Sequence, residues 1–105
     1  MKTFYTETEQ SHLEFAADYW DIPVGEIQKA GVMAIRYING LAGTTGSNPL
    51  RPRPTSDGPT GYSSDWAPDE RRALDWVSHH HELPYSETQK LGAIVMICVA
   101  AVASQ

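Results

Sequence analysis

Apolar residues recur at helical spacing along most of this chain. Leu13, Ala16, Ala17 and Trp20 fall on one face and predict an amphipathic helix near residues 7–20. The same reasoning predicts three more helices, over 26–42, from Pro68 onward, and over 87–103. Alternation of polar and apolar residues over strand-like lengths is scarce. We therefore expect an all-α fold without a large sheet.

The predicted helices form a repeat. A shift of 61 positions aligns residues 9–42 with residues 70–103 without a gap. The shift places DIPVGEIQKAG (21–31) on ELPYSETQKLG (82–92), and apolar positions coincide along the helices that follow. Self-similarity at a fixed spacing indicates an internal duplication.

The repeat suggests how the chain is organised. We expect one domain over 1–105, built from two tandem pseudo-symmetric helical hairpins that contain four helices in all. The first hairpin covers about 6–42 and the second about 68–104. A long loop rich in glycine and proline, 43–67, joins them, and no helix or strand pattern survives in it.

Helix capping explains much of the repeated motif. Thr6 and Glu9 have the spacing of a capping box at the start of the first helix. Gly25 and Ser86 are the predicted N-caps of the second helix of each hairpin. Gln28 and Gln89 then occupy the third helical position, where a side chain can return a hydrogen bond to the cap. The two glutamines occupy equivalent positions of the repeat.

Two repeated residue types have no capping role. Gly31 and Gly92 fall inside their helices, where each costs about 1 kcal/mol relative to alanine. Close approach of another backbone would justify that cost, so we expect the hairpins to pack through these two helices. Lys29 and Lys90 remain without a structural role and are candidates for binding.

Charge narrows the range of partners. The net charge is -5 and the pI is about 5.2. An acidic surface repels phosphate backbones, which makes nucleic acid an unlikely partner. The single cysteine, Cys98, lies in an apolar run and indicates a reducing compartment. We expect a cytoplasmic protein.

The apolar run 91–103 has two interpretations. It is well short of the roughly 20 residues that span a bilayer, so we expect no membrane association. A helix that is apolar all round is buried all round. The helix over 91–103 is therefore either the centre of the monomer or the interface of a homodimer.

The sequence carries no recognisable catalytic motif. We find no nucleophile elbow, phosphate loop or zinc-protease motif, and we expect neither enzymatic activity nor a cofactor. The run His79-His80-His81-Glu82 invites a metal hypothesis. However, consecutive helical residues point about 100° apart, so we interpret it as a polar helix end without a metal.

The predicted loop holds the strongest binding candidates. Arg51 and Arg53 are separated by proline on a polar stretch, and two such guanidinium groups can hold an anion. Tyr62 follows, and arginine and tyrosine are both enriched at binding hot spots. Arg36, on the polar stripe of the predicted helix 26–42, completes the set with Lys29 and Lys90.

A family resemblance points the same way. The stretches IQKAGVMAIRYI (27–38) and TQKLGAIVMICVAAVA (88–103) resemble a helix of small phage proteins that sequester cyclic-nucleotide signals, the anti-CBASS and anti-Thoeris sponge type. In the first stretch Gln28, Gly31, Met33 and Arg36 match that pattern, whereas the second stretch has isoleucine where Arg36 aligns. The resemblance implies a ligand-binding helical oligomer.

We interpret the protein as a small non-enzymatic binding protein, a phage-type inhibitor that sequesters or blocks a host factor. The target is either a protein surface or a small anionic nucleotide. The alternative is a helix-turn-helix transcriptional regulator, in which the helix that starts at Glu26 would lie in the DNA groove.

Overall fold

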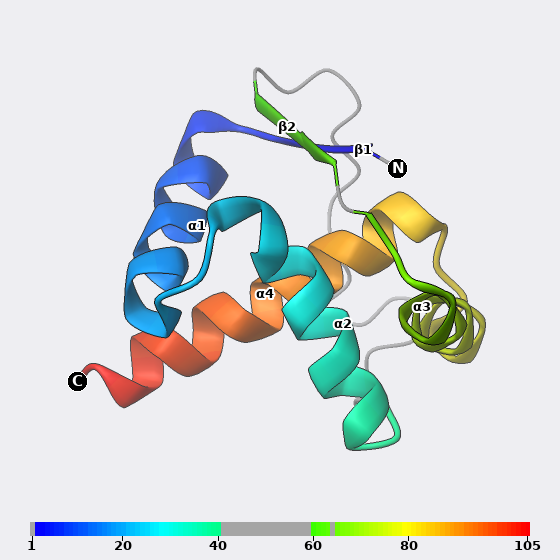
Figure 1. The fold of residues 1–105 in the computed structure, drawn as a ribbon. Coiled ribbons are helices and arrows are strands. Elements are labelled where there is room, and N and C mark those ends of the chain that lie inside the picture. Colours follow the sequence, from blue (N-terminus) through cyan, green and yellow to red (C-terminus); the bar gives the residue numbers. More distant parts are fainter. Residues whose placement is uncertain (1, 41–59, 64) are drawn as a thin grey trace.

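The computed structural model describes residues 2–40, 60–63 and 65–105, and within them the fold is all-α, as predicted (Figure 1). Its helices are α1 (Glu7–Trp20), α2 (Ile27–Tyr37), α3 (Pro68–His81) and α4 (Tyr85–Ala103). A 3-10 turn, η1 (Val24–Glu26), leads into α2. α1 starts and ends at the predicted residues, and α3 begins at Pro68, where the missing N–H of proline is harmless.

A short antiparallel ribbon accompanies the helices. β1 (Lys2–Tyr5) pairs with β2 (Thr60–Ser63), with Thr3 opposite Tyr62. The expectation that residues 43–67 contain no strand is therefore wrong for β2. Four residues are too few for a strand pattern to stand out, and the pairing partner lies at the other end of the chain. Residues 41–59 and 64 lie outside the described parts.

The capping box that opens α1 is confirmed. The Glu9 backbone N–H donates to the Thr6 hydroxyl at 3.2 Å, and the Thr6 N–H donates to the Glu9 carboxylate at 2.8 Å. Two amide donors at the helix start thus have side-chain partners. The arrangement also fixes the Glu9 carboxylate at the first turn of α1.

The N-caps predicted for the other two helices are wrong. α4 starts two residues earlier than predicted, at Tyr85, with Pro84 as its N-cap, so Ser86 is already helical. Gly25 lies inside η1, and Glu26 is the N-cap of α2. Neither Pro84 nor Glu26 caps its helix through its side chain. Pro84 holds the backbone extended just before α4. In front of α2, the 3-10 turn supplies the first helical hydrogen bonds.

The glutamines of the motif are buried instead of capping. Gln28 and Gln89 are both fully buried. The Tyr5 hydroxyl donates to the Gln28 side-chain oxygen at 2.7 Å, which ties β1 to α2. The Gln89 amide has no hydrogen-bond partner among the described residues. These residues therefore belong to the interior of the fold.

The acidic residue that opens each motif ends the helix before it. Asp21 and Glu82 are the C-caps of α1 and α3, and both adopt the left-handed conformation, with φ of 56° in each. The next residue then returns a hydrogen bond into the helix, from Ile22 N–H to the Ala17 carbonyl and from Leu83 N–H to the Ser78 carbonyl. This is the pattern of a Schellman motif, usually built with glycine.

The closest helix contact lies at the two glycines, as expected from the sequence. α2 packs more extensively against α4 than against any other described element. A Cβ atom on Gly31 would lie 1.9 Å from the Gly92 carbonyl oxygen, so only glycine permits the approach. The tandem pseudo-symmetry of the whole fold stays a prediction, although both glycines occupy equivalent positions of the sequence repeat.

Two apolar clusters form the core. The first joins β1, α1 and the start of α2 to α4, and the second joins α2 and α3 to the first half of α4. The first contains Tyr5, Leu13, Ala16, Ala17, Ile27 and Ala93; the second contains Val32, Ile35, Leu74, Val77, Leu83 and Leu91. The first half of α4 is thus enclosed by other elements, whereas its C-terminal half extends away from α2 and α3 (Figure 1).

Candidate functional site

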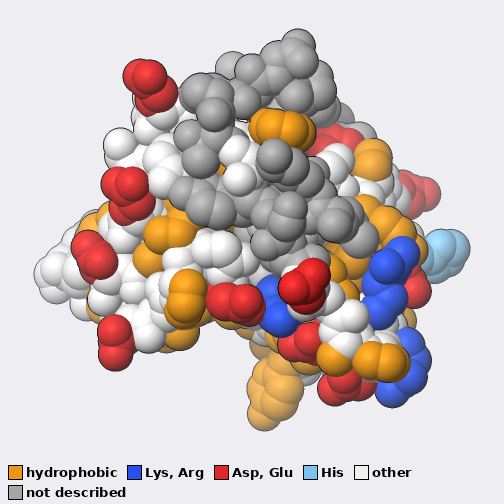
Figure 2. Space-filling view, turned by 45° about the horizontal axis from the view of Figure 1, so that its top comes forward, with side chains coloured by type: hydrophobic (Ala, Val, Ile, Leu, Met, Phe, Trp, Pro, Cys, Tyr) orange, Lys and Arg blue, Asp and Glu red, His pale blue; other side chains and the backbone are white. Residues whose placement is uncertain are grey.

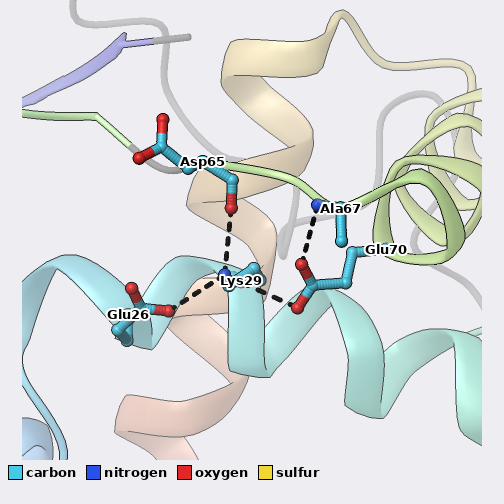
Figure 3. Close-up of polar contacts among 5 residues, drawn as sticks. All are labelled: Glu26, Lys29, Asp65, Ala67 and Glu70. Carbon is cyan, nitrogen blue, oxygen red and sulfur yellow. Dashed lines mark hydrogen bonds and ion pairs between the residues drawn. The ribbon is translucent and has the colours of Figure 1, made fainter.

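Lys29 lies at the centre of a polar cluster that joins three elements (Figure 3). Its ammonium group is 3.3 Å from the Glu26 carboxylate of η1 and 3.5 Å from the Glu70 carboxylate of α3. It also donates to the Asp65 carbonyl oxygen at 2.9 Å. Glu70 is itself held at the start of α3, because its carboxylate accepts a hydrogen bond from the Ala67 N–H at 2.9 Å.

The two carboxylates determine the charge state of Lys29. Partial burial alone would lower the pKa of its ammonium group. The Glu26 carboxylate, and to a smaller extent the Glu70 carboxylate, outweigh the burial and raise the pKa above its ordinary value. Lys29 is therefore protonated at neutral pH and is matched by two negative charges. The cluster carries a net charge of about -1, and the ammonium group serves to join α2 to α3.

Lys90 has a similar internal role. Its ammonium group is 3.4 Å from the Glu9 carboxylate and lies 5.1 Å from the centre of the Tyr5 ring. Only 4% of its side chain is exposed. Glu9 and Glu70 both sit in the first turn of a helix, so each repeated lysine binds the opening turn of a helix in the other predicted hairpin. This supplies the structural role that the sequence left unexplained.

Arg36 also packs inward. Its guanidinium group lies 4.4 Å from the centre of the Trp76 ring on α3 and donates to the Asn39 side-chain oxygen at 2.9 Å. Lys29 and Arg36 are seven residues apart and so share one face of α2, which is turned toward α3. The stripe expected to face solvent or a partner through Arg36 and Asn39 is thus partly used to fasten these two helices.

The remaining predicted binding residues cannot be placed against this cluster. Arg51 and Arg53 lie outside the described residues. Tyr62 is described only as a backbone position in β2, opposite Thr3. Among the three predicted binding residues whose side chains are described, Lys29 and Arg36 share the α3-facing side of α2. Lys90, on α4, has its own partners on α1 and β1.

A groove opens beside the Lys29 cluster. Its volume is about 300 Å³. Apolar side chains of the turn before α2 and of α2 itself line one part, and the charged cluster lines the other; the lining residues are Ile22, Pro23, Glu26, Lys29, Ala30, Met33 and Glu70. The groove therefore combines a small apolar floor with an acidic rim.

The groove continues into an exposed apolar face that the sequence analysis missed. Beyond Met33, the exposed side of α2 carries Ala34 and Tyr37, and Ile38 follows as the C-cap of the helix. Tyr37 is 87% exposed and Ile38 is 55% exposed. No role was predicted for Tyr37 or Ile38 from the sequence. A helical projection with Gly31 at the contact with α4 would have found Tyr37, because positions 33 and 37 then fall on the opposite side. Ile38 does not follow from the projection, because it is the C-cap that follows the last helical residue.

The histidine run at the end of α3 forms a packed cluster. The His80 ring stacks on the Trp76 ring with centroids 4.6 Å apart, and the buried His81 ring meets His80 edge to face. Burial first, and the neighbouring His80 second, lower the pKa of His81. No group of three metal-binding side chains occurs among the described residues.

Known proteins add no further information about this site. Comparison of the chain with protein families, with curated proteins and with solved structures finds no match.

Proposed function

We propose that this protein is a small non-enzymatic binding protein that docks a partner protein on the outward face of α2. The observation that carries the proposal is the exposure of Tyr37 and Ile38, at 87% and 55%, next to a groove on the same helix. Soluble proteins rarely leave a large aromatic and a β-branched residue side by side in water without a use for them. Tyrosine is also a frequent hot-spot residue.

The groove indicates what the partner segment should look like. A volume of about 300 Å³ accommodates one large apolar side chain. Glu26 is 48% exposed and Glu70 is 26% exposed, so two carboxylates flank the opening while a single ammonium group offsets them. The matching partner presents an apolar anchor next to a lysine or arginine, which would meet this acidic rim.

An anionic nucleotide has weaker support as the target. Such a ligand needs cations that are free to bind it, but Lys29 is matched by two carboxylates and Arg36 packs against Trp76. Two of the residues that carry the family resemblance also have structural roles: Gly31 contacts Gly92, and Gln28 accepts a hydrogen bond from Tyr5. The nucleotide hypothesis therefore depends on Arg51 and Arg53.

A DNA-binding role has weaker support too. A recognition helix presents polar and basic side chains to the major groove. The outward face of α2 is apolar, and its opposite face is buried against α4 at Gly31. Figure 2 shows acidic side chains spread over this view of the molecule, with basic side chains in small patches beside them.

Capture of a partner from a host lysate tests the proposal. The wild-type protein should retain a partner that the double variant Tyr37→Lys/Ile38→Lys loses. A loss of about 2 kcal/mol, typical of a hot spot, weakens binding about 30-fold. Both positions are exposed, so circular dichroism and thermal melting should show an intact fold.

Two control variants locate the site. Tyr19→Lys places the same lysine on an exposed position of α1 and should leave capture unchanged. The double variant Arg51→Ala/Arg53→Ala tests the predicted loop. If the partner is retained by Tyr37→Lys/Ile38→Lys and lost by the arginine variant, the α2 face is not the binding site.

A further inference from the structure

The C-terminal half of α4 is apolar but poorly buried. From Leu91 to Ala103 the helix has no charged residue. Leu91, Gly92 and Ala93 are buried, whereas Cys98 is exposed, Val99 is 47% exposed and Val102 is 70% exposed. A helix that is apolar all round normally has neighbours all round. The single chain supplies neighbours on all sides only to the first half; in the second half Ala100 is buried, but the side that carries Cys98, Val99 and Val102 is exposed.

A hollow lies on the same side of the helix. It has a volume of about 400 Å³ and runs between α1 and α4. Glu9, His12 and Lys90 line its polar part, and Ile94, Ile97 and Cys98 line its apolar part. In a helix, Ile94, Cys98 and Val102 follow one another at four-residue steps along one face. That face therefore presents a hollow beside Ile94 and a protruding side chain at Val102, with Cys98 between them.

We propose that this face of α4 is the interface of a homodimer, in which two copies of α4 cross antiparallel at Cys98. A two-fold axis at Cys98 brings residues equally far before and after it into contact, so Val102 of one copy lies over Ile94 of the other. The protruding valine of each copy then fills the hollow of its mate. Neither half of this arrangement is complete in a single chain.

The distribution of charge favours association of two copies through this face of α4 and opposes association through other surfaces. With a net charge of -5, two copies repel each other across most of their surfaces. The outer side of α1, for example, exposes Glu7, Glu14 and Asp18. The exposed residues of this α4 face carry no charge, and Glu9 and Lys90, which line the hollow, pair with each other at 3.4 Å, so the face can meet itself without burying an unpaired charge.

A membrane fits this face less well. By length and composition, α4 is the one helix in the described parts that could span a bilayer, but 44% of the apolar stretch is buried inside the fold. The half that is free, about ten residues, spans only about 15 Å, half of a hydrocarbon core of about 30 Å. Insertion of the whole helix would also separate Gly92 from Gly31. Residues 91–105 contain no lysine or arginine to bind anionic lipid.

Sedimentation over a range of concentrations tests the dimer directly. Wild-type protein should reach twice the chain mass of 11.6 kDa as its concentration rises, and Val102→Lys should stay at 11.6 kDa. Ile38→Lys is the matched control, because it places the same lysine at an exposed apolar position at the end of α2. It should still form the dimer, although it belongs to the surface assigned to the partner protein.

Cross-linking tests the position of the axis. Helix axes that pack about 8–10 Å apart bring directly facing Cα atoms to roughly 4–6 Å, within reach of a disulfide. Diamide should therefore join the two Cys98 thiols, taking up the two electrons and two protons released as the S–S bond forms. The control Cys98→Ser/Ser11→Cys carries its only cysteine on an exposed position of α1 and should cross-link more slowly.

Three results would overturn the proposal. Wild-type protein that remains at 11.6 kDa at every concentration is not a dimer, even if it binds lipid vesicles or a host protein. Val102→Lys that dimerises like the wild type would move the interface off this face. If the Cys98 thiols cross-link no faster than the thiols of Cys98→Ser/Ser11→Cys, the two-fold axis does not pass near Cys98. None of these results bears on the α2 surface, which capture by Tyr37→Lys/Ile38→Lys tests separately.

Discussion

Replacement of Gly31 by alanine should destabilise the fold, although alanine is the better helix former. The new Cβ would lie 1.9 Å from the Gly92 carbonyl oxygen and 2.2 Å from its carbonyl carbon. Ordinary contact starts near 3.4 Å, so α2 and α4 must separate by about 1.5 Å or shift sideways. Both partners are backbone, and no side chain can rotate away to make room.

The size of the effect follows from two opposing contributions. Helix propensity alone favours alanine by about 1 kcal/mol. Overpacking costs about 1–3 kcal/mol where the surroundings can relax, and here separation also opens the contacts of Val32 and Leu91 in the core. Taking the upper end of the overpacking range, we expect a net loss of about 2 kcal/mol in the free energy of unfolding, or a melting temperature lower by roughly 8–16 °C.

Urea denaturation followed by circular dichroism measures this loss. Ala34→Gly is the matched control, because it changes the same two residue types in reverse on the exposed side of the same helix. It should cost only about 1 kcal/mol. Gly92→Ala should resemble Gly31→Ala, since its Cβ would lie 2.6 Å from the Gln28 carbonyl oxygen. If Gly31→Ala is as stable as the wild type or more so, the two helices do not cross at these glycines.

Two further changes in stability are expected. Asp21 caps α1 in the left-handed conformation, so Asp21→Gly should stabilise the fold by about 1 kcal/mol; the control Asp18→Gly, inside the same helix, should destabilise it by a few tenths to 1 kcal/mol, and equal effects would refute the capping role. Burial lowers the pKa of His81, so the unfolded chain takes up its proton first and the free energy of unfolding should decrease as pH falls below about 6.5. Denaturation at two pH values checks this prediction, which fails if His81→Gln has the same pH dependence as the wild type.

Local patterns predicted most of the fold. The capping box at Thr6, the start of α3 at Pro68 and the close approach at Gly31 each depend on residues near one another in sequence or on one strong steric rule. The errors at Gly25 and Ser86 have one cause. Proline and a 3-10 turn can start a helix without a capping side chain, and sequence preferences describe the commoner solution.

The candidate site was harder to predict because it depends on contacts between distant residues. Lys29 was a binding candidate because capping gave it no structural role, but Glu26 and, from α3, Glu70 both pair with it. Arg36 was assigned to a free polar stripe, but Trp76 covers it. Conversely, no role was predicted for Tyr37 and Ile38, and their exposure becomes evident only once α2 is packed against α4.

Photo-cross-linking from the outward face of α2 tests the central claim of a protein-binding surface most directly. A photoreactive phenylalanine derivative is introduced in place of Tyr37, and in a control protein in place of Tyr19, a tyrosine on α1 that is 43% exposed. Irradiation in host lysate should give one discrete cross-linked partner from position 37 and none from position 19. Equal cross-linking from both positions, or a partner captured only from position 19, would contradict the account.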